Sequence, residues 1–221
     1  MLRFWVPVLG SAVLVLCSTV AGVAGQSQRS ARVLSCDGPF APTMTAESLA
    51  AVFGQANVTT EDVHVGEGFF EKGTVLFSKS PEDRLEIHWR DEQVPNTPSF
   101  LKVRAERTRW RTAGGLTIGL HLRAVERLNR RPFRLSGFGW DYGGGVQNWS
   151  GGMLERVAGE GCQVSARLTP AQNAAGEYAL GAEKFLDQVG GERHYSSGHP
   201  AMQVVNPIVR ELFLLYRSQK R

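Results

Sequence analysis

The sequence lacks the short motifs that mark the common enzyme and nucleic-acid-binding classes. Its 221 residues contain no GxSxG around a serine, no phosphate-binding loop and no dinucleotide fingerprint, so hydrolases and nucleotide-dependent enzymes of the usual kinds are not indicated. No nucleic-acid-binding module is present, and a net charge of +4 does not by itself imply a polyanionic partner. We therefore expect no motif-defined catalytic residue, no cofactor and no nucleic-acid partner.

Histidine is also scarce, with five copies, which limits the places where a metal ion could bind. The densest group is HYSSGH, from His194 to His199. Histidines five residues apart in a loop are not a known zinc spacing, and no carboxylate stands beside them, so we expect no metal. We interpret the stretch as a polar loop stopped by Pro200, and we expect His64 and His88 to be solvated on strands. The alternative is a hydrolase or metal-dependent enzyme centred on His194, Ser196, Ser197 and His199 with Asp141.

The N-terminal segment is typical of a secretory signal peptide. A short basic start is followed by a run without charge from Phe4 to Gly25, which ends in small residues before Gln26. We predict that residues 1–25 are removed and that the mature chain lies in the periplasm or outside the cell, with no stable membrane span. An uncleaved anchor is the alternative, because about 20 apolar residues can cross a membrane. Lipid attachment at Cys17 is disfavoured, because Leu16 stands where a small residue is expected.

Only three cysteines are present, and Cys17 would leave with the signal peptide. An exported chain would then carry Cys36 and Cys162 into an oxidising compartment, where we expect them to form a disulfide. The loop of about 125 residues makes this bond worth roughly 5 kcal/mol in the chain-entropy model. Alternation around Cys162 places it on the apolar face of a strand with Val164 and Leu168. Two separate buried thiols are the alternative.

Charge is distributed unevenly along the chain. Residues 46–92 contain ten acidic and four basic side chains, whereas residues 102–134 contain ten basic and two acidic ones. One interpretation is that the two segments attract each other within the fold. The other is that the basic segment forms a face for an anionic component of the cell envelope.

Hydrophobic periodicity predicts an α+β fold in which helices pack against an antiparallel sheet. One helix is expected after Thr45 and before Gly54, a second from about 121 to 129, and a third at about 177–187. Six strand-like stretches alternate between apolar and polar residues, and residues 207–217 form a last strand or a short helix. The order of elements suggests a weak internal duplication. We expect one domain, 26–221, made of two units at about 40–112 and 113–216.

The stretch GFGWDYGGGVQNWSGG, residues 137–152, combines seven glycines with two tryptophans. We predict a strand from Phe138 to Tyr142 and a hairpin turn at the three consecutive glycines, because glycine permits positive φ angles. Trp140 would then share a strand face with Phe138 and Tyr142, as part of the core or, alternatively, of a binding platform. Asp141 is expected to cap the turn. Trp149, after the turn, is expected to be only partly covered.

This stretch, together with SSGHPAMQVVNP, resembles a family of exported bacterial proteins that share a GFGWDYGG core, and the resemblance implies no particular activity. The order of helices and strands is similar, at fold level only, to the β-lactamase inhibitor protein fold and to related outer-membrane assembly lipoproteins.

These observations favour a non-enzymatic periplasmic or secreted binding protein. The expected partner is another envelope protein or an anionic envelope component. The candidate binding residues are Trp140, Asp141, Tyr142 and Trp149.

Overall fold

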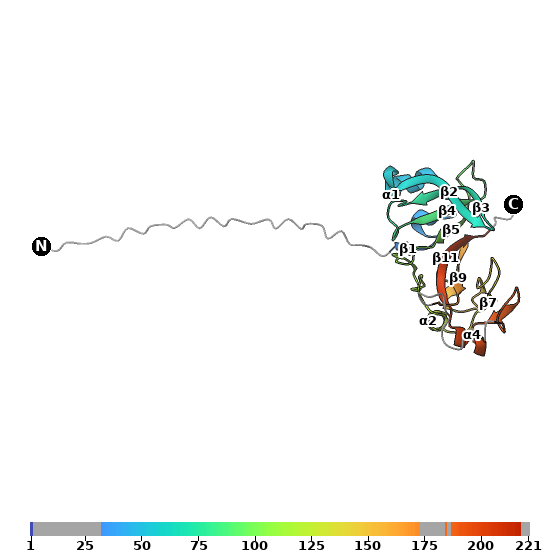
Figure 1. Ribbon diagram of the computed structural model, residues 1–221. Coiled ribbons are helices and arrows are strands. Elements are labelled where there is room, and N and C mark those ends of the chain that lie inside the picture. The colour runs from blue at the N-terminus through green and yellow to red at the C-terminus, as the bar shows by residue number, and fades with distance from the viewer. Residues whose placement is uncertain (2–31, 173–183, 185–186, 218–221) are drawn as a thin grey trace. The chain divides into compact units, whose positions relative to one another are not determined.

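Antiparallel strands dominate the computed structural model of the protein, which describes Met1 and residues 32–172, 184 and 187–217 (Figure 1). The largest sheet has the strand order β2-β3-β4-β5-β11-β9, and every neighbouring pair is antiparallel. Its strands are β2 (Val58–Gly66), β3 (Phe69–Leu76), β4 (Leu85–Trp89), β5 (Pro98–Val103), β9 (Cys162–Thr169) and β11 (Ile208–Tyr216). Together with the helices described below, this sheet confirms the predicted α+β class.

The C-terminal segment is a strand, and it lies inside the large sheet. β11 pairs with β5 on one side and with β9 along its length on the other. Strands β2 to β5 form an antiparallel meander, to which the second predicted unit adds only β9 and β11. The order of the described strands therefore shows no internal duplication. Residues Ala31–Arg221 form one compact unit.

Two smaller sheets flank this arrangement. β1 (Arg32–Leu34) pairs in parallel with β6 (Trp110–Thr112), and β7 (Arg134–Ser136) lies between β8 (Val146–Asn148) and β10 (His194–Ser196).

Asp83 links the first small sheet to the chain before β4. Its buried carboxylate binds both Arg32 and Arg109, and Trp110 Nε1 donates to its carbonyl oxygen at 2.7 Å. Burial opposes ionisation, but hydrogen bonds from the two arginines outweigh it and lower the pKa of Asp83 to about 2. Arg109 belongs to the basic segment and Asp83 to the acidic one. Their ion pair therefore neutralises part of the uneven charge within the fold.

The three described α-helices are short. Two of them, α1 and α2, lie where the sequence predicts. α1 (Ala46–Phe53) starts at a capping box in which the side chain of Thr45 accepts from Ser48 N, and it ends at Gly54 with φ 87°. α2 (Leu122–Asn129) buries Leu122 and Val125, but Asn129 is its last residue and Arg130 takes the left-handed conformation.

The third helix, α4 (Pro200–Val205), starts where we expected only a loop stopped by proline. Pro200 suits the first turn because no backbone N–H is needed there, and the side chain of His199 caps this turn by accepting from Ala201 N. The predicted helix at 177–187 lies outside the described residues. Among the described helices, none has the length and apolar character needed to cross a membrane.

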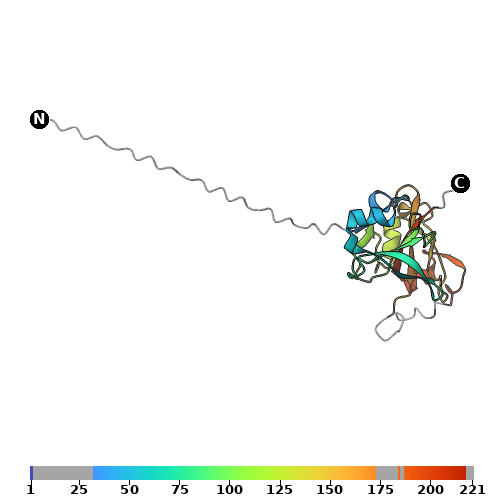
Figure 2. The same ribbon diagram turned by 90° about the horizontal axis from the view of Figure 1, so that it is seen from above.

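The core contains side chains from both the large sheet and the helices. Figure 2 shows the fold from above. Leu49 of α1 and Val125 of α2 are fully buried in the same core as Leu101 and Leu212 of the sheet. β9 shows the predicted alternation, with Val164, Ala166 and Leu168 buried and the residues between them facing the other way.

The predicted disulfide between Cys36 and Cys162 is present, with a Cα–Cα distance of 6.2 Å. Both cysteines are buried in the core, with 4% and 2% of their surface exposed. The bond joins the segment before α1 to the first residue of β9. It therefore ties the segment that precedes the first predicted unit to a strand of the second.

β4 differs from the sequence-based expectation. We predicted one apolar and one solvated polar face, but all five of its residues are buried. His88 has no exposed surface, and it stacks on Phe100 of the neighbouring strand at 4.0 Å between ring centroids. Glu86 and Lys102 are also buried on this face. The expectation failed because the ends of β2 and β3 carry His64 and Glu71 onto the polar face of β4.

Candidate functional site

The glycine-rich stretch forms a compact loop between β7 and β8. The predicted strand from Phe138 to Tyr142 is wrong, since β7 ends at Ser136 and only Phe138 makes a bridge, to Gly190. Gly144 has φ 71°, and a side chain there would clash with the carbonyl oxygen of Leu168 in β9. A side chain at Gly137 would lie 2.6 Å from Val189 O. The glycines therefore allow the loop backbone to pack directly on two distant segments.

Our assignments for the two tryptophans are reversed in the structure. Trp149 is only 3% exposed, packs on Phe133 and donates from Nε1 to Val164 O at 2.7 Å. Trp140 is only half-buried, and its Nε1 donates to Gly137 O within the loop. Trp149 is thus a core residue and not part of an exposed site. The error for Trp140 arose because residues 138–142 are not a strand, so the alternation of faces does not apply to them. Trp149 follows β8 and is buried because it reaches Val164 of β9.

Asp141 and Tyr142 are exposed and line an open pocket of about 600 Å³. The opposite wall is the tip of the β2–β3 hairpin, residues 66–68, with His64 beside it, and Arg167 of β9 completes the lining. Asp141 thus lines a pocket wall at the turn where we expected it to act as a cap. The sequence separates these parts by up to a hundred residues, and the fold brings them together.

Both signs of charge line this pocket. Glu67 and Asp141 supply carboxylates, whereas Arg167 supplies a guanidinium group. Arg167 binds Glu211 of β11 at 3.1 Å and lies 5.9 Å from the centre of the Tyr142 ring. Among the described residues, its buried Nε has no hydrogen-bond partner. The pocket is therefore lined by one arginine that is already paired with Glu211 and by two exposed acidic side chains.

A buried polar cluster adjoins the pocket through His64. Lys102 Nζ donates to His64 O and lies 3.5 Å from Glu86 Oε2. His88 Nδ1 lies 2.8 Å from Glu71 Oε1. Burial, aided by the positive charge of Lys102, lowers the pKa of His88 to about 3, so the ring is neutral at physiological pH and donates to Glu71. Burial, aided by the nearby Glu92, raises the pKa of Glu71.

This cluster holds the hairpin against the sheet. Gly73 allows close packing within the sheet, because a side chain there would lie 2.5 Å from a methyl group of Val63 and 2.9 Å from Ile87 O. Three polar contacts then fix its ends, from Lys102 to His64, from His88 to Glu71, and from Lys72 N to Glu92 at 2.7 Å. The wall of the pocket is therefore positioned by buried groups and not by a free loop.

Two phenylalanines at the hairpin tip are the most exposed aromatic residues that the structure describes. Phe69 is 66% exposed and Phe70 is 64% exposed, whereas Tyr142 across the pocket is 45% exposed. Phe70 contacts the pocket through His64, whose ring centroid lies 5.3 Å from its own. We call Phe69, Phe70 and Tyr142 the aromatic rim. The sequence analysis missed the hairpin tip, although GEGFF, with glycines before two aromatics, is a signal that could have found it.

The HYSSGH loop has structural contacts throughout. Ser197 is fully buried, and its hydroxyl donates to Glu126 Oε1 at 2.6 Å and accepts from Phe133 N. His199 caps α4, and His194 is exposed in β10. Within the described part of the chain, no group of three histidine, cysteine or acidic side chains is arranged to hold a metal ion. Asp141 lines the pocket at the tip of the β2–β3 hairpin instead.

No family model, no curated protein and no solved structure matches the chain. The resemblances suggested by the GFGWDYGG core and by the order of elements therefore stay predictions, and the site rests on its own geometry.

Proposed function

We propose that the chain is an exported, non-enzymatic binding protein that recognises another envelope protein through the aromatic rim and the pocket beside it. The observation that carries this proposal is the exposure of Phe69, Phe70 and Tyr142, of which Tyr142 lines the charged pocket and Phe70 packs on its lining residue His64. Exposed aromatic side chains are enriched at the centres of protein interfaces, where they supply most of the binding energy.

The chemistry of the pocket favours a protein partner. A small-molecule site encloses most of its ligand, whereas this pocket is open and neither Phe69 nor Phe70 is among the residues that line it. Mixed charges surrounding exposed aromatics match the polar rim and apolar centre of a protein interface. The partner is therefore expected to present an apolar patch edged by both charge signs.

A double variant tests the rim. Phe69→Ser with Phe70→Ser removes two exposed rings, and we expect it to lose most of the partner captured from an envelope extract, about tenfold or more by quantitative mass spectrometry. The matched control is Val52→Ser with Met153→Ser, since both residues are exposed apolar side chains elsewhere. The control should capture as much partner as the wild type, and all three proteins should have similar melting temperatures. If the rim variant captures the same proteins in the same amounts, the rim is not the binding surface.

Export has its own test. We expect the mature chain to begin near Gln26, because the small residues that end the apolar run fit a cleavage site. Intact-mass analysis of the extracytoplasmic fraction measures this directly. Recovery of the full-length chain in the membrane fraction would show instead that residues 1–25 act as an anchor.

A further inference from the structure

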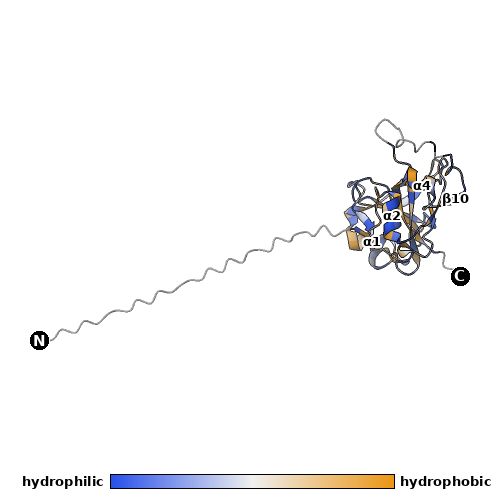
Figure 3. Cartoon of the chain, turned by 90° about the horizontal axis from the view of Figure 1, so that it is seen from below, coloured by the Kyte–Doolittle hydropathy of each residue, from blue (hydrophilic) through white to orange (hydrophobic). Residues whose placement is uncertain are grey.

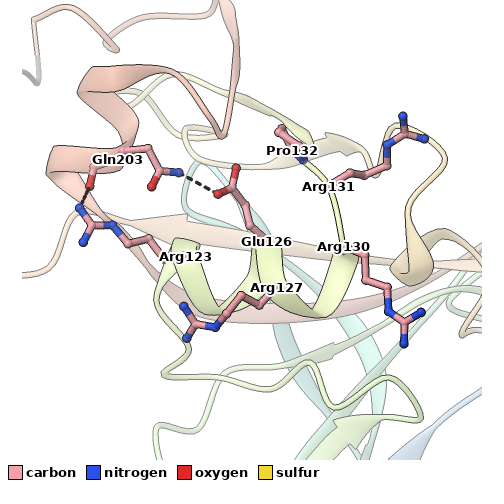
Figure 4. A pocket seen from close by; sticks show the side chains of 7 residues that line it. All are labelled: Arg123, Glu126, Arg127, Arg130, Arg131, Pro132 and Gln203. Carbon is pink, nitrogen blue, oxygen red and sulfur yellow. Dashed lines mark hydrogen bonds between the residues drawn. The ribbon is translucent and has the colours of Figure 1, made fainter.

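A second pocket, of about 450 Å³, lies between α2, the loop that follows it, and α4 (Figure 4). Arg123 and Arg127 come from α2, and Arg130 and Arg131 from the following loop. Gln203 of α4 lies opposite. None of these residues belongs to the aromatic rim.

The burial pattern of α2 creates this basic edge. Leu122 and Val125 face the core, so Arg123 and Arg127 are directed outward. Viewed from below, α2 accordingly shows mostly hydrophilic residues (Figure 3). Arg130 has φ 61°, which ends the helix, and Arg131 after it also lines the pocket.

The single acidic residue that lines the pocket is already bound. Glu126 accepts from Ser197 Oγ at 2.6 Å through Oε1 and from Gln203 Nε2 at 2.8 Å through Oε2. Arg123 donates to the carbonyl oxygen of Gln203 at 2.7 Å. The carboxylate of Glu126 is thus held by neutral groups and forms no ion pair with the arginines.

The four arginines differ from those that stabilise the fold. Among the described residues, no carboxylate lies within 4 Å of any of the four. Six other arginines do form such pairs: Arg32, Arg84, Arg104, Arg109, Arg167 and Arg210. Attraction between the acidic segment, residues 46–92, and the basic segment, residues 102–134, therefore explains the ion pair of Arg109. It does not explain the four arginines of this pocket.

Helix electrostatics account for only part of the cluster. Cations near the C-terminus of a helix are favoured by its dipole, which suits Arg127. Arg123 stands in the first turn, where the dipole disfavours a cation, and it is four residues from Arg127, a spacing at which like charges destabilise a helix. These two effects oppose the stability of the helix in the free protein, and a bound anion would offset them.

We propose that this pocket binds a compound that carries more than one phosphate group. The planar fork of a guanidinium group matches two phosphate oxygens. Figure 4 shows Arg123 and Arg127 on one side of Glu126 and Arg130 and Arg131 on the other, an arrangement that suits separate phosphate groups for the two pairs. The volume suits a small phosphorylated molecule or the headgroup of a lipid with two phosphates.

Tripolyphosphate is the soluble probe, measured by calorimetry on the purified exported chain. We expect Arg127→Gln with Arg130→Gln to raise the Kd at least about tenfold, because two cationic contacts are lost. The control is Arg107→Gln with Arg111→Gln, which removes the same charge from two exposed arginines elsewhere, and should change the Kd less than about twofold. Equal weakening by both pairs would show that only net charge matters and would overturn the proposal.

Vesicles distinguish the sources of phosphate. The wild type and both double variants are sedimented with vesicles of phosphatidylcholine, with and without cardiolipin. Cardiolipin-dependent binding that needs Arg127 and Arg130 supports a lipid source, whereas binding of tripolyphosphate without vesicle binding supports a soluble one. Failure of the wild type to bind either probe at low ionic strength would overturn the proposal. The Phe69 and Phe70 variant should bind as the wild type does, so this test is independent of the proposed protein interface.

Discussion

Replacing Trp149 by alanine is expected to lower the free energy of unfolding by about 3–5 kcal/mol, as for other large-to-small changes at buried aromatics. The ring is only 3% exposed and packs on Phe133. Its loss would open a cavity and would leave Val164 O without its indole donor. Such a change is a large share of the stability of a domain of this size. Urea denaturation followed by far-ultraviolet circular dichroism measures it.

Trp140→Ala is the matched comparison. Its ring is half-buried and bonds only within its own loop, so we expect a loss of under about 2 kcal/mol. Trp149→Phe keeps most of the packing and removes the donor, and it should fall between the two. A larger loss for Trp140→Ala than for Trp149→Ala would restore the sequence-based assignment and contradict the structure of the loop.

Removal of the disulfide is expected to cost about 4–5 kcal/mol in the chain-entropy model, because Cys36 and Cys162 are 126 residues apart. Replacing both cysteines by alanine keeps the core apolar and removes the constraint that the disulfide places on the unfolded chain. The urea midpoint of this variant should match that of the wild type treated with a reductant.

The oxidised wild type should unfold at clearly higher urea than either of those samples. Equal midpoints for the oxidised wild type and the alanine variant would mean that the bond adds no stability. Two alkylatable thiols in the native exported protein would mean that it does not form.

Local patterns predicted β9 and α1 well. The alternation in β9 placed Val164 and Leu168 on the buried face, because a period of two residues is a property of any strand. Thr45 and Gly54 marked the ends of α1 through hydrogen bonds and a φ angle that involve only neighbouring residues. Such features need no knowledge of distant parts of the chain.

The candidate site could not be predicted in the same way. The glycines of the loop are needed because their backbone meets Leu168 and Val189, which are contacts between distant segments. The polar face of β4 is buried because His64 and Glu71 are carried over it. The sequence therefore identified Asp141 and Tyr142 as candidates, but the partners that surround them, His64, Glu67 and Arg167, follow only from the fold.

Site-specific photo-crosslinking tests the proposed interface most directly. A benzophenone side chain at position 70, in the aromatic rim, is compared with the same group at position 52, which is also exposed. In cells that express the exported chain, the account predicts one discrete protein adduct at position 70 and none at position 52. Adducts that are absent from position 70, or that form equally at both positions, would contradict the claim that the rim is a protein-binding surface.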